Sequence, residues 1–164
     1  PVVSFVDEPG FMVGTEAQDK GIVRAGARMV IAQSRSQSPW ISFYMKQAYG
    51  VAGQTHARPR GMYHRYAWPS GKWGSMHIEG GVSAAYRRDI ASAKDPEARR
   101  QEIESNLNAM ASPFRTAEAT GDDAAHGIDI IDPRDTRPLL CDFVHMAQDM
   151  LDMQLGPPTV PYMP

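Results

Sequence analysis

The sequence predicts a protein of the α/β class. Segments rich in β-branched and aromatic residues, at 2–6 and 39–45, alternate with segments in which apolar residues recur at helical spacing. Glycine and proline residues separate the two kinds of segment. Because strands and helices that alternate along a chain pack as layers around one core, we expect a sheet covered by helices.

The N-terminal third predicts a strand, a helix, a second strand and a loop of small residues. Aliphatic residues flank Phe5 without polar alternation, which favours a strand over 2–6 that is buried on both faces. Thr15 is expected to be the N-cap of the helix. One face of this helix is expected to carry Ile22, Gly26, Met29, Val30 and Gln33. The second strand is expected over 39–45, and the loop over 48–53.

The middle of the chain predicts less regular structure. Glycines and prolines are frequent through most of 54–75, which favours a loop, with a short hairpin as an alternative. A strand is expected at 66–68, where Pro69 ends it. A helix is expected over 79–90.

The sequence Asp95-Pro96-Glu97 is a helix start signal, with Asp95 as the N-cap and proline at the first helical position. The helix it begins is expected to place Ile103, Leu107 and Met110 on one face and to end at Ser112-Pro113. Acidic neighbours balance the arginine pairs at 87–88 and 99–100, so we expect these pairs on solvated helix faces.

The C-terminal part predicts one more helix. A polar link over 122–127 and a short apolar piece over 128–131 precede it. Either Asp135 or Thr136 is expected to cap the helix, which continues to about residue 154. Its apolar stripe consists of Leu140, Phe143, Val144, Ala147, Met150 and Leu151.

Length and composition exclude several classes of protein. The 164 residues fit one domain, and 42% apolar composition is enough for a core. The net charge is −2 and no basic stripe is present, which argues against a nucleic-acid partner. No apolar run is long enough for a membrane span, and no signal peptide is recognisable. The single cysteine, Cys141, favours a reducing compartment, so we expect a cytoplasmic location.

Side chains alone do not predict a catalytic mechanism. None of the five histidines has the spacing of a helical zinc site, and no Gly-x-Ser-x-Gly motif is present, so we expect no metal. Cys141 and His145 are four residues apart on one helix and could touch. The simpler interpretation is that Cys141 packs in the core and His145 lies at its edge.

The loop over 48–53 is the better candidate for chemistry. Small residues after a strand allow a ligand to approach the backbone closely, and backbone N–H groups there can stabilise a developing negative charge. A plain tight turn between strand and helix is the alternative at this stage.

Six blocks of the sequence point to a known family. They are DEPGFMVGT at 7–15, GIVRAGARM at 21–29, KQAYG at 46–50, YAWPS at 66–70, EGGV at 79–82 and IIDPRDTRPLL at 130–140. In this order they resemble the carboxyltransferase (beta) subunits of biotin-dependent acyl-CoA carboxylases, of the acetyl- and propionyl-CoA carboxylase type. The resemblance implies a crotonase-like fold of the ClpP/crotonase superfamily, built from repeated ββα units in two roughly perpendicular sheets.

The resemblance also implies a site and a reaction. The family loop carries Gly-Gly-Ala and supplies an oxyanion hole, so Val51 and Ala52 are the implied catalytic residues, acting through their N–H groups. Gly50, Gly53 and Tyr49 are the implied cofactor-binding residues, and Val51 departs from the family pattern. Biotin, carried on a partner protein, would bring CO2, which the enolate of an acyl-CoA would attack. The implied partners are an acyl-CoA, a biotin carboxyl carrier protein, a biotin carboxylase subunit and further copies of this chain.

The blocks match only the C-terminal, biotin-side part of such subunits. We therefore expect residues 1–156 to form a crotonase-like carboxyltransferase domain that is incomplete at its N-terminus, and 157–164 to form a tail. Two alternatives stay open. One is a biotin-dependent acyl-CoA decarboxylase subunit, which runs the transfer in reverse, and the other is an assembly fragment without activity.

Overall fold

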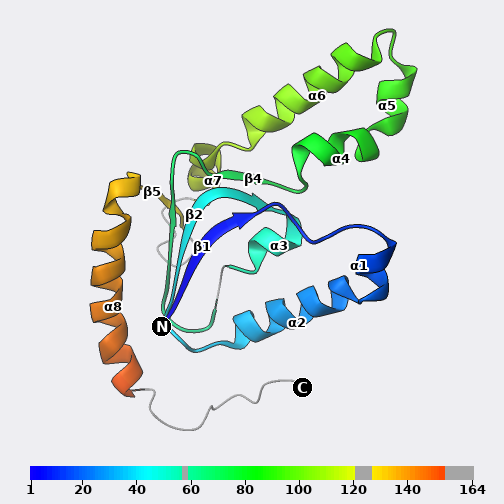
Figure 1. Ribbon diagram of the computed structural model, residues 1–164. Coiled ribbons are helices and arrows are strands. Elements are labelled where there is room, and N and C mark those ends of the chain that lie inside the picture. Colours follow the sequence, from blue (N-terminus) through cyan, green and yellow to red (C-terminus); the bar gives the residue numbers. More distant parts are fainter. Residues whose placement is uncertain (57–58, 121–126, 154–164) are drawn as a thin grey trace.

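The computed structural model describes residues 1–56, 59–120 and 127–153, and its centre is one parallel sheet (Figure 1). The strands are β1 (Val2–Glu8), β2 (Trp40–Tyr49), β3 (Tyr63–Ala67), β4 (Lys72–Gly74) and β5 (Asp129–Ile130). Their order is β1-β2-β3-β5. The long strand β2 pairs β3 along its first half and β4 along its second. The predicted α/β class is thus confirmed, with the described strands in a single sheet that branches at β2.

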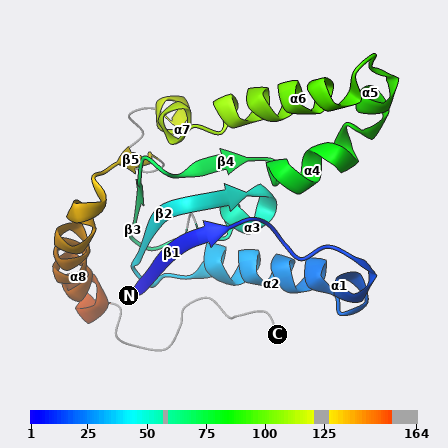
Figure 2. The same ribbon diagram turned by 45° about the horizontal axis from the view of Figure 1, so that its top comes forward.

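Helices of very different length surround this sheet. They are α1 (Thr15–Asp19), α2 (Ile22–Arg35), α3 (Gly50–Gln54), α4 (Ile78–Ala85), α5 (Arg87–Ser92), α6 (Pro96–Met110), α7 (Pro113–Thr120) and α8 (Thr136–Met153). Two views show α4, α5 and α6 as an arm that projects beyond the sheet (Figures 1 and 2). Where the arm meets the sheet, Tyr49 packs in one apolar cluster with Ile78, Val82, Ile103 and Ala111. In the part of the chain that the structure describes, no helix is long and apolar enough to cross a membrane.

The two faces of the sheet have different neighbours. The register aligns Phe5 with Phe43 and Ser42 with Arg65, and paired residues share a face. On one face, Ile41 and Phe43 pack against Phe143 and Ala147 of α8. On the other, Val6, Tyr44, Ala48, Ala67 and Ile128 form a cluster next to α3. This second face carries the candidate site.

The prediction that β1 is buried on both faces is wrong. Val3 is 38% exposed and Phe5 is 52% exposed, although the Phe5 ring stacks on Phe43 at 5.5 Å. The reason is position, because β1 is an edge strand and α8 packs against the neighbouring strand β2.

The first predicted helix is two helices. Gly21 adopts φ 73°, a left-handed conformation that ends α1 and precedes α2. The N-cap of α1 is Gly14 and not Thr15, and Met29 is 44% exposed rather than on the inner face. Gly26 is buried as expected, because the Phe11 ring occupies the space into which a Cβ would project.

The central segment is more regular than the sequence predicted. Strand β2 continues to Tyr49, and the expected loop over 48–53 is the end of this strand followed by helix α3. Strand β3 begins at Tyr63 and pairs in parallel, so the alternative of a hairpin is wrong. The expected helix over 79–90 divides at Tyr86 into α4 and α5. Ser112-Pro113 ends α6 as expected but also begins α7, a helix that the sequence analysis missed.

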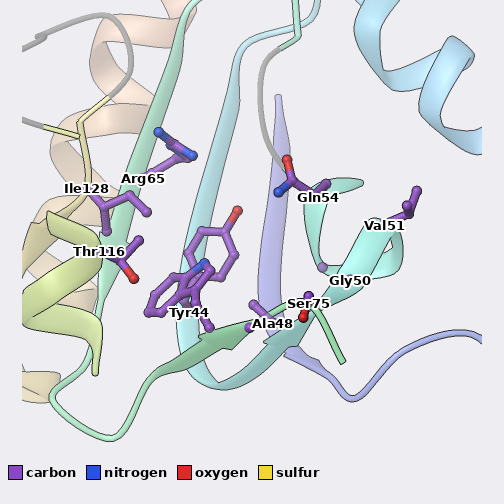
Figure 3. Close-up of a pocket in the computed structure, with 12 residues that line it drawn as sticks. Tyr44, Ala48, Gly50, Val51, Gln54, Arg65, Ser75, Thr116 and Ile128 are labelled. Carbon is purple, nitrogen blue, oxygen red and sulfur yellow. The ribbon is translucent and has the colours of Figure 1, made fainter. Parts of the chain in front are cut away.

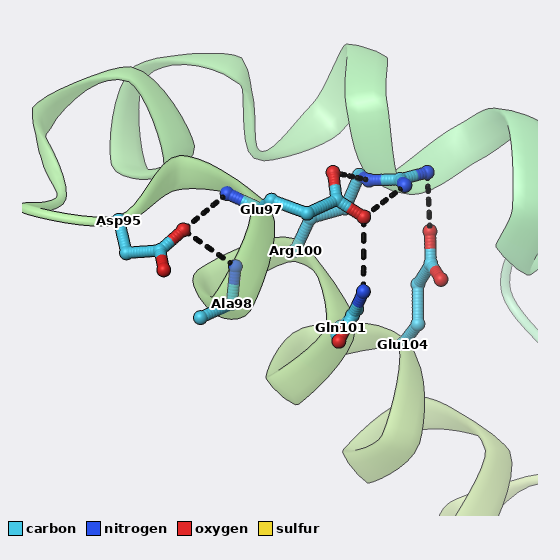
Figure 4. A network of polar contacts seen from close by, with 6 residues as sticks. All are labelled: Asp95, Glu97, Ala98, Arg100, Gln101 and Glu104. Atoms are coloured by element: carbon cyan, nitrogen blue, oxygen red, sulfur yellow. Dashed lines mark hydrogen bonds and ion pairs between the residues drawn. The ribbon is translucent and has the colours of Figure 1, made fainter.

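The N-terminus of α6 is confirmed. Asp95 accepts hydrogen bonds from the N–H groups of Glu97 at 3.1 Å and Ala98 at 3.0 Å (Figure 4). Arg100 lies between Glu97 and Glu104 on the solvated side of the helix, as the balance of charges predicted. Ile103 is buried, whereas Met110 is 53% exposed, so the inner face of α6 is narrower than expected.

Replacing Asp95 with alanine should lower the free energy of unfolding by about 0.5–2 kcal/mol, because two N–H groups of α6 lose their acceptor. Chemical denaturation measures this change. Asp95→Asn is the matched control, since asparagine keeps an acceptor oxygen and caps about equally well. Equal losses in the two variants would contradict the capping role.

The last helix begins as expected but is capped differently. Asp132 accepts a hydrogen bond from the N–H of Arg134 at 2.9 Å and so caps the 3-10 turn Pro133–Asp135. Helix α8 follows from Thr136. Phe143 and Ala147 are buried, but Val144 is 40% exposed and Cys141 is exposed, so the expectation that Cys141 packs in the core is wrong. The predicted link over 122–127, except Gly127, and the predicted tail over 157–164 lie outside the described residues.

Candidate functional site

A pocket of about 760 Å³ opens on the face of the sheet that carries Tyr44 and Arg65 (Figure 3). One wall is the first turn of α3, which contributes Gly50 and Val51. The opposite wall includes Arg65 from β3. Further lining residues are Trp73, Ser75, Thr116 and Ile128. The pocket therefore collects segments that lie far apart in the sequence.

Two glycines allow α3 to sit at this pocket. Gly50 has φ 60°, and a Cβ there would lie 3.3 Å from the carbonyl oxygen of Ser75. A Cβ on Gly53 would lie 2.5 Å from the carbonyl carbon of Ala48, which is closer than real Cβ contacts. Helix α3 therefore turns back directly onto the end of β2, and this geometry requires glycine at both positions.

The start of α3 presents backbone donors. Tyr49 is the N-cap, and no side chain caps this helix among the described residues. The first N–H groups of a helix have no partner in its own ladder. In α3 these belong to Gly50, Val51 and Ala52. Gly50 and Val51 line the pocket, whereas Ala52 lies behind them.

The structure brings only some of the predicted site residues to the pocket surface. Gly50, Val51 and Gly53 line it, and the Val51 side chain is 61% exposed. Ala52 and Tyr49 are buried, at 2% and 3% exposure. The Tyr49 ring points into the apolar cluster and meets the edge of His77 at 5.9 Å between ring centroids. Neither residue lines the pocket, and Tyr49 supports the turn from the apolar cluster.

The sequence analysis missed the residues of the opposite wall. Burial raises the pKa of the Tyr44 hydroxyl to about 12, against the opposing positive charge of Arg65. The Tyr44 ring also packs against Trp73, with ring centroids 4.9 Å apart. The one available signal was Arg65 itself, an arginine directly before the apolar run of Tyr66-Ala67-Trp68.

Three of the described histidines have structural contacts. Ser4 Oγ lies 2.7 Å from His56 Nδ1, and the His64 ring meets Phe143 edge to face. Burial lowers the pKa of His56 and of His64, with nearby acidic groups opposing the shift. His77 Nδ1 accepts a hydrogen bond from Gly80 N–H and caps α4. No group of three or more potential metal ligands gathers anywhere in residues 1–56, 59–120 and 127–153.

Comparison with known proteins assigns the chain to a family. The carboxyl transferase domain matches residues 1–154. The propionyl-CoA carboxylase carboxyltransferase subunit of Haloferax mediterranei is 37% identical over 139 residues, which are 84% of this chain and 26% of that relative. The methylmalonyl-CoA decarboxylase subunit alpha of Propionigenium modestum is 30% identical over 150 residues, which are 90% of this chain and 28% of that relative.

A solved structure shows the same fold. The crystal structure of transcarboxylase 12S, described as a hexamer with methylmalonyl-coenzyme A and methylmalonic acid bound, aligns with a TM-score of 0.71 and 34% identity. The alignment covers 90% of this chain and 28% of that one. The expected crotonase-like fold is confirmed. The chain spans about a quarter of the length of the relatives it matches, and over that length it belongs to the carboxyl transferase domain family.

Proposed function

We propose that this chain is part of the carboxyltransferase component of a biotin-dependent acyl-CoA carboxylase. In this reaction a carboxyl group moves from carboxybiotin to the α carbon of an acyl-CoA. The observation that carries the proposal is the open pocket beside the uncapped first turn of α3, in a chain of this family. Residues 1–156 would be the biotin-side part of the enzyme, and 157–164 a tail.

The N–H groups of Val51 and Ala52 would supply the catalysis that this chain contributes. Negative charge develops on oxygen atoms during carboxyl transfer, and donors already fixed in position stabilise it without reorganisation. The close contact of Gly53 with Ala48 holds the first turn of α3 in place. No side-chain base is required of this chain, which agrees with the structural contacts of His56, His64 and His77.

The residues present fit biotin as the group brought to this pocket. Tyr44 and Trp73 offer an aromatic wall for its fused rings, and the N–H groups of α3 offer donors for its urea oxygen. When bound, carboxybiotin supplies the carboxyl group. Gly50 and Gly53 would bind through their backbone, and Tyr49 would hold the turn from the apolar cluster.

The proposed partners follow from the same assignment. They are an acyl-CoA, a biotin carboxyl carrier protein, a biotin carboxylase subunit and further copies of this chain. The exposed Val3 and Phe5 on an edge strand support contact with another protein surface. The single cysteine supports a reducing, cytoplasmic location.

A decarboxylase subunit is the second candidate. A relative of 30% identity carries that name, so family membership does not decide the direction of transfer. A carboxylase and a decarboxylase would use the same donors, because the charged species is the same in both directions.

The experiment is an assay of the enzyme that contains this chain. Carboxyl transfer would be followed in both directions, with acetyl-, propionyl- and longer acyl-CoA substrates and their carboxylated forms. We expect transfer that depends on a biotinylated carrier. Absence of transfer with every substrate, in an assembled and folded enzyme, would support the third reading, a part that serves assembly alone.

A further inference from the structure

Arg65 is a half-buried cation, two of whose donor atoms are buried without a partner among the described residues. These atoms are Nε and Nη2. The side chain lies on the face of β3 that borders the pocket, where the register places it beside Ser42. A hydrogen bond with the Tyr44 hydroxyl uses only part of the donor capacity of the guanidinium. Two of its donor atoms therefore remain for a ligand.

Such an arrangement is costly in a folded protein. A buried donor of a charged group that lacks a partner lowers stability more than a neutral one. Arginine cannot relieve the cost by losing its proton, since it keeps its charge at any pH at which proteins are folded. Buried charges in folded proteins are usually paired, so an anion that binds here would relieve the cost.

The described residues that line the pocket include no anionic side chain. Arg65 is the only charged side chain among these described residues. The remaining surface is made of aromatic, aliphatic, hydroxyl and amide groups. A ligand with a negative group would find one fixed cation in otherwise neutral surroundings, so that its charge decides its orientation.

Arg65 and α3 face each other across the pocket. Figure 3 shows Arg65, Thr116 and Ile128 on one side, Val51 and Gln54 on the other, and Tyr44 between them. An anionic group bound at Arg65 would therefore lie apart from an oxygen atom bound at the α3 donors.

We propose that Arg65 binds a carboxylate group of the acyl-CoA in this pocket. The planar guanidinium can donate two parallel hydrogen bonds to the two oxygens of a carboxylate, and Nε and Nη2 form one such pair. The inference rests on the proposed function and adds a residue that selects the substrate. The carboxylate has two possible sources, namely the group that is transferred or a second carboxylate at the far end of the acyl chain.

The test is the affinity of the purified protein for matched pairs of coenzyme A esters, measured by calorimetry. Malonyl-CoA against acetyl-CoA tests the transferred group, and glutaryl-CoA against butyryl-CoA tests a distal carboxylate. Arg65→Met should raise the Kd of the responsible carboxylated ester by about tenfold to a hundredfold. The Kd of its neutral partner should stay within a factor of about two, and Arg65→Lys should recover part of the affinity.

Controls separate binding from folding. Arg28→Met removes an exposed arginine of α2 and should leave every Kd unchanged. Arg65→Met should fold, because methionine keeps most of the side-chain volume and removes two buried donors that lack partners. Circular dichroism and the thermal midpoint verify folding, and a folded variant whose Kd for both carboxylated esters equals that of the parent would overturn the inference.

Other outcomes are equally decisive. If Arg65→Met loses affinity equally for acetyl-CoA, malonyl-CoA and free coenzyme A, then Arg65 binds a phosphate group of coenzyme A. That result would overturn the proposal that it binds a carboxylate. A change of oligomeric state in Arg65→Met, with affinities unchanged, would assign it to a contact between copies. If carboxylated esters bind through Arg65 while no transfer is detected, the proposed function fails and this inference stands. If transfer occurs but the Kd of every ester is the same in Arg65→Met and in the parent, this inference fails and the proposed function stands.

Discussion

Replacing Val51 with proline is expected to lower the turnover of carboxyl transfer by about 10²–10³-fold in the assembled enzyme. Proline has no N–H, so the variant lacks one of the two proposed oxyanion donors. Val51 is the second residue of α3, and its N–H has no partner in the helix itself, so the variant loses no helical hydrogen bond. Initial rates at saturating substrate measure the effect.

Val51→Ala is the matched control for this experiment. It shortens the same side chain but keeps the backbone N–H, so its turnover should stay within a few-fold of the parent. Circular dichroism and the thermal midpoint report whether α3 and the sheet survive in both variants. If Val51→Pro is folded and turns over like Val51→Ala, the backbone donor at this position is not used.

Elements with local signals were the ones that the sequence predicted well. Asp95-Pro96-Glu97 contains the N-cap, the proline and the acidic residue within three positions, and the helix starts there. The apolar residues around Ile41 and Phe43 predicted β2 for the same reason, since the signal lies within the strand. Ser112-Pro113 shows the limit of local signals, because the same pair can end one helix and begin the next.

Features that depend on distant partners could not be predicted in this way. The exposure of Phe5 follows from the strand order and from the position of α8, which enters the chain more than a hundred residues later. The opposite wall of the pocket is another case. Arg65 faces α3 because β3 pairs in parallel with β2, and nothing within the segment around it predicts that pairing.

The candidate site was predicted in part for the same reason. The loop with Gly50, Val51 and Gly53 was singled out because small residues after a strand are a local pattern, and the family resemblance assigned roles to these residues. That they form a helix start depends on the fit of Gly53 against Ala48, which is a contact between backbone atoms. Tyr49 belongs to the same segment of the sequence. Its ring, however, packs in the apolar cluster with Ile78 and Val82 and does not line the pocket.

The Gly53→Ala variant should therefore be defective in both stability and turnover. The added Cβ would lie 2.5 Å from the carbonyl carbon of Ala48 and 2.9 Å from its oxygen, so α3 must move away from the end of β2. Crowding of this kind typically lowers the free energy of unfolding by about 1–3 kcal/mol. A displacement near 1 Å of positioned groups can reduce turnover by about 10²-fold, so we expect a loss of that order.

Gly80→Ala is the control that separates this steric effect from the general effect of adding a methyl group to a helical glycine. Gly80 lies within α4, and the nearest atom to its added Cβ is His77 Nδ1 at 3.8 Å, an ordinary contact. Alanine there should raise the free energy of unfolding by about 0.5–1 kcal/mol, because glycine is the poorer helix former. The two variants should thus move stability in opposite directions, as measured by chemical denaturation. Suppose instead that Gly53→Ala also stabilises the protein and keeps full turnover. The close contact between Gly53 and Ala48 would then not be what holds the N–H donors of the first turn of α3 in place.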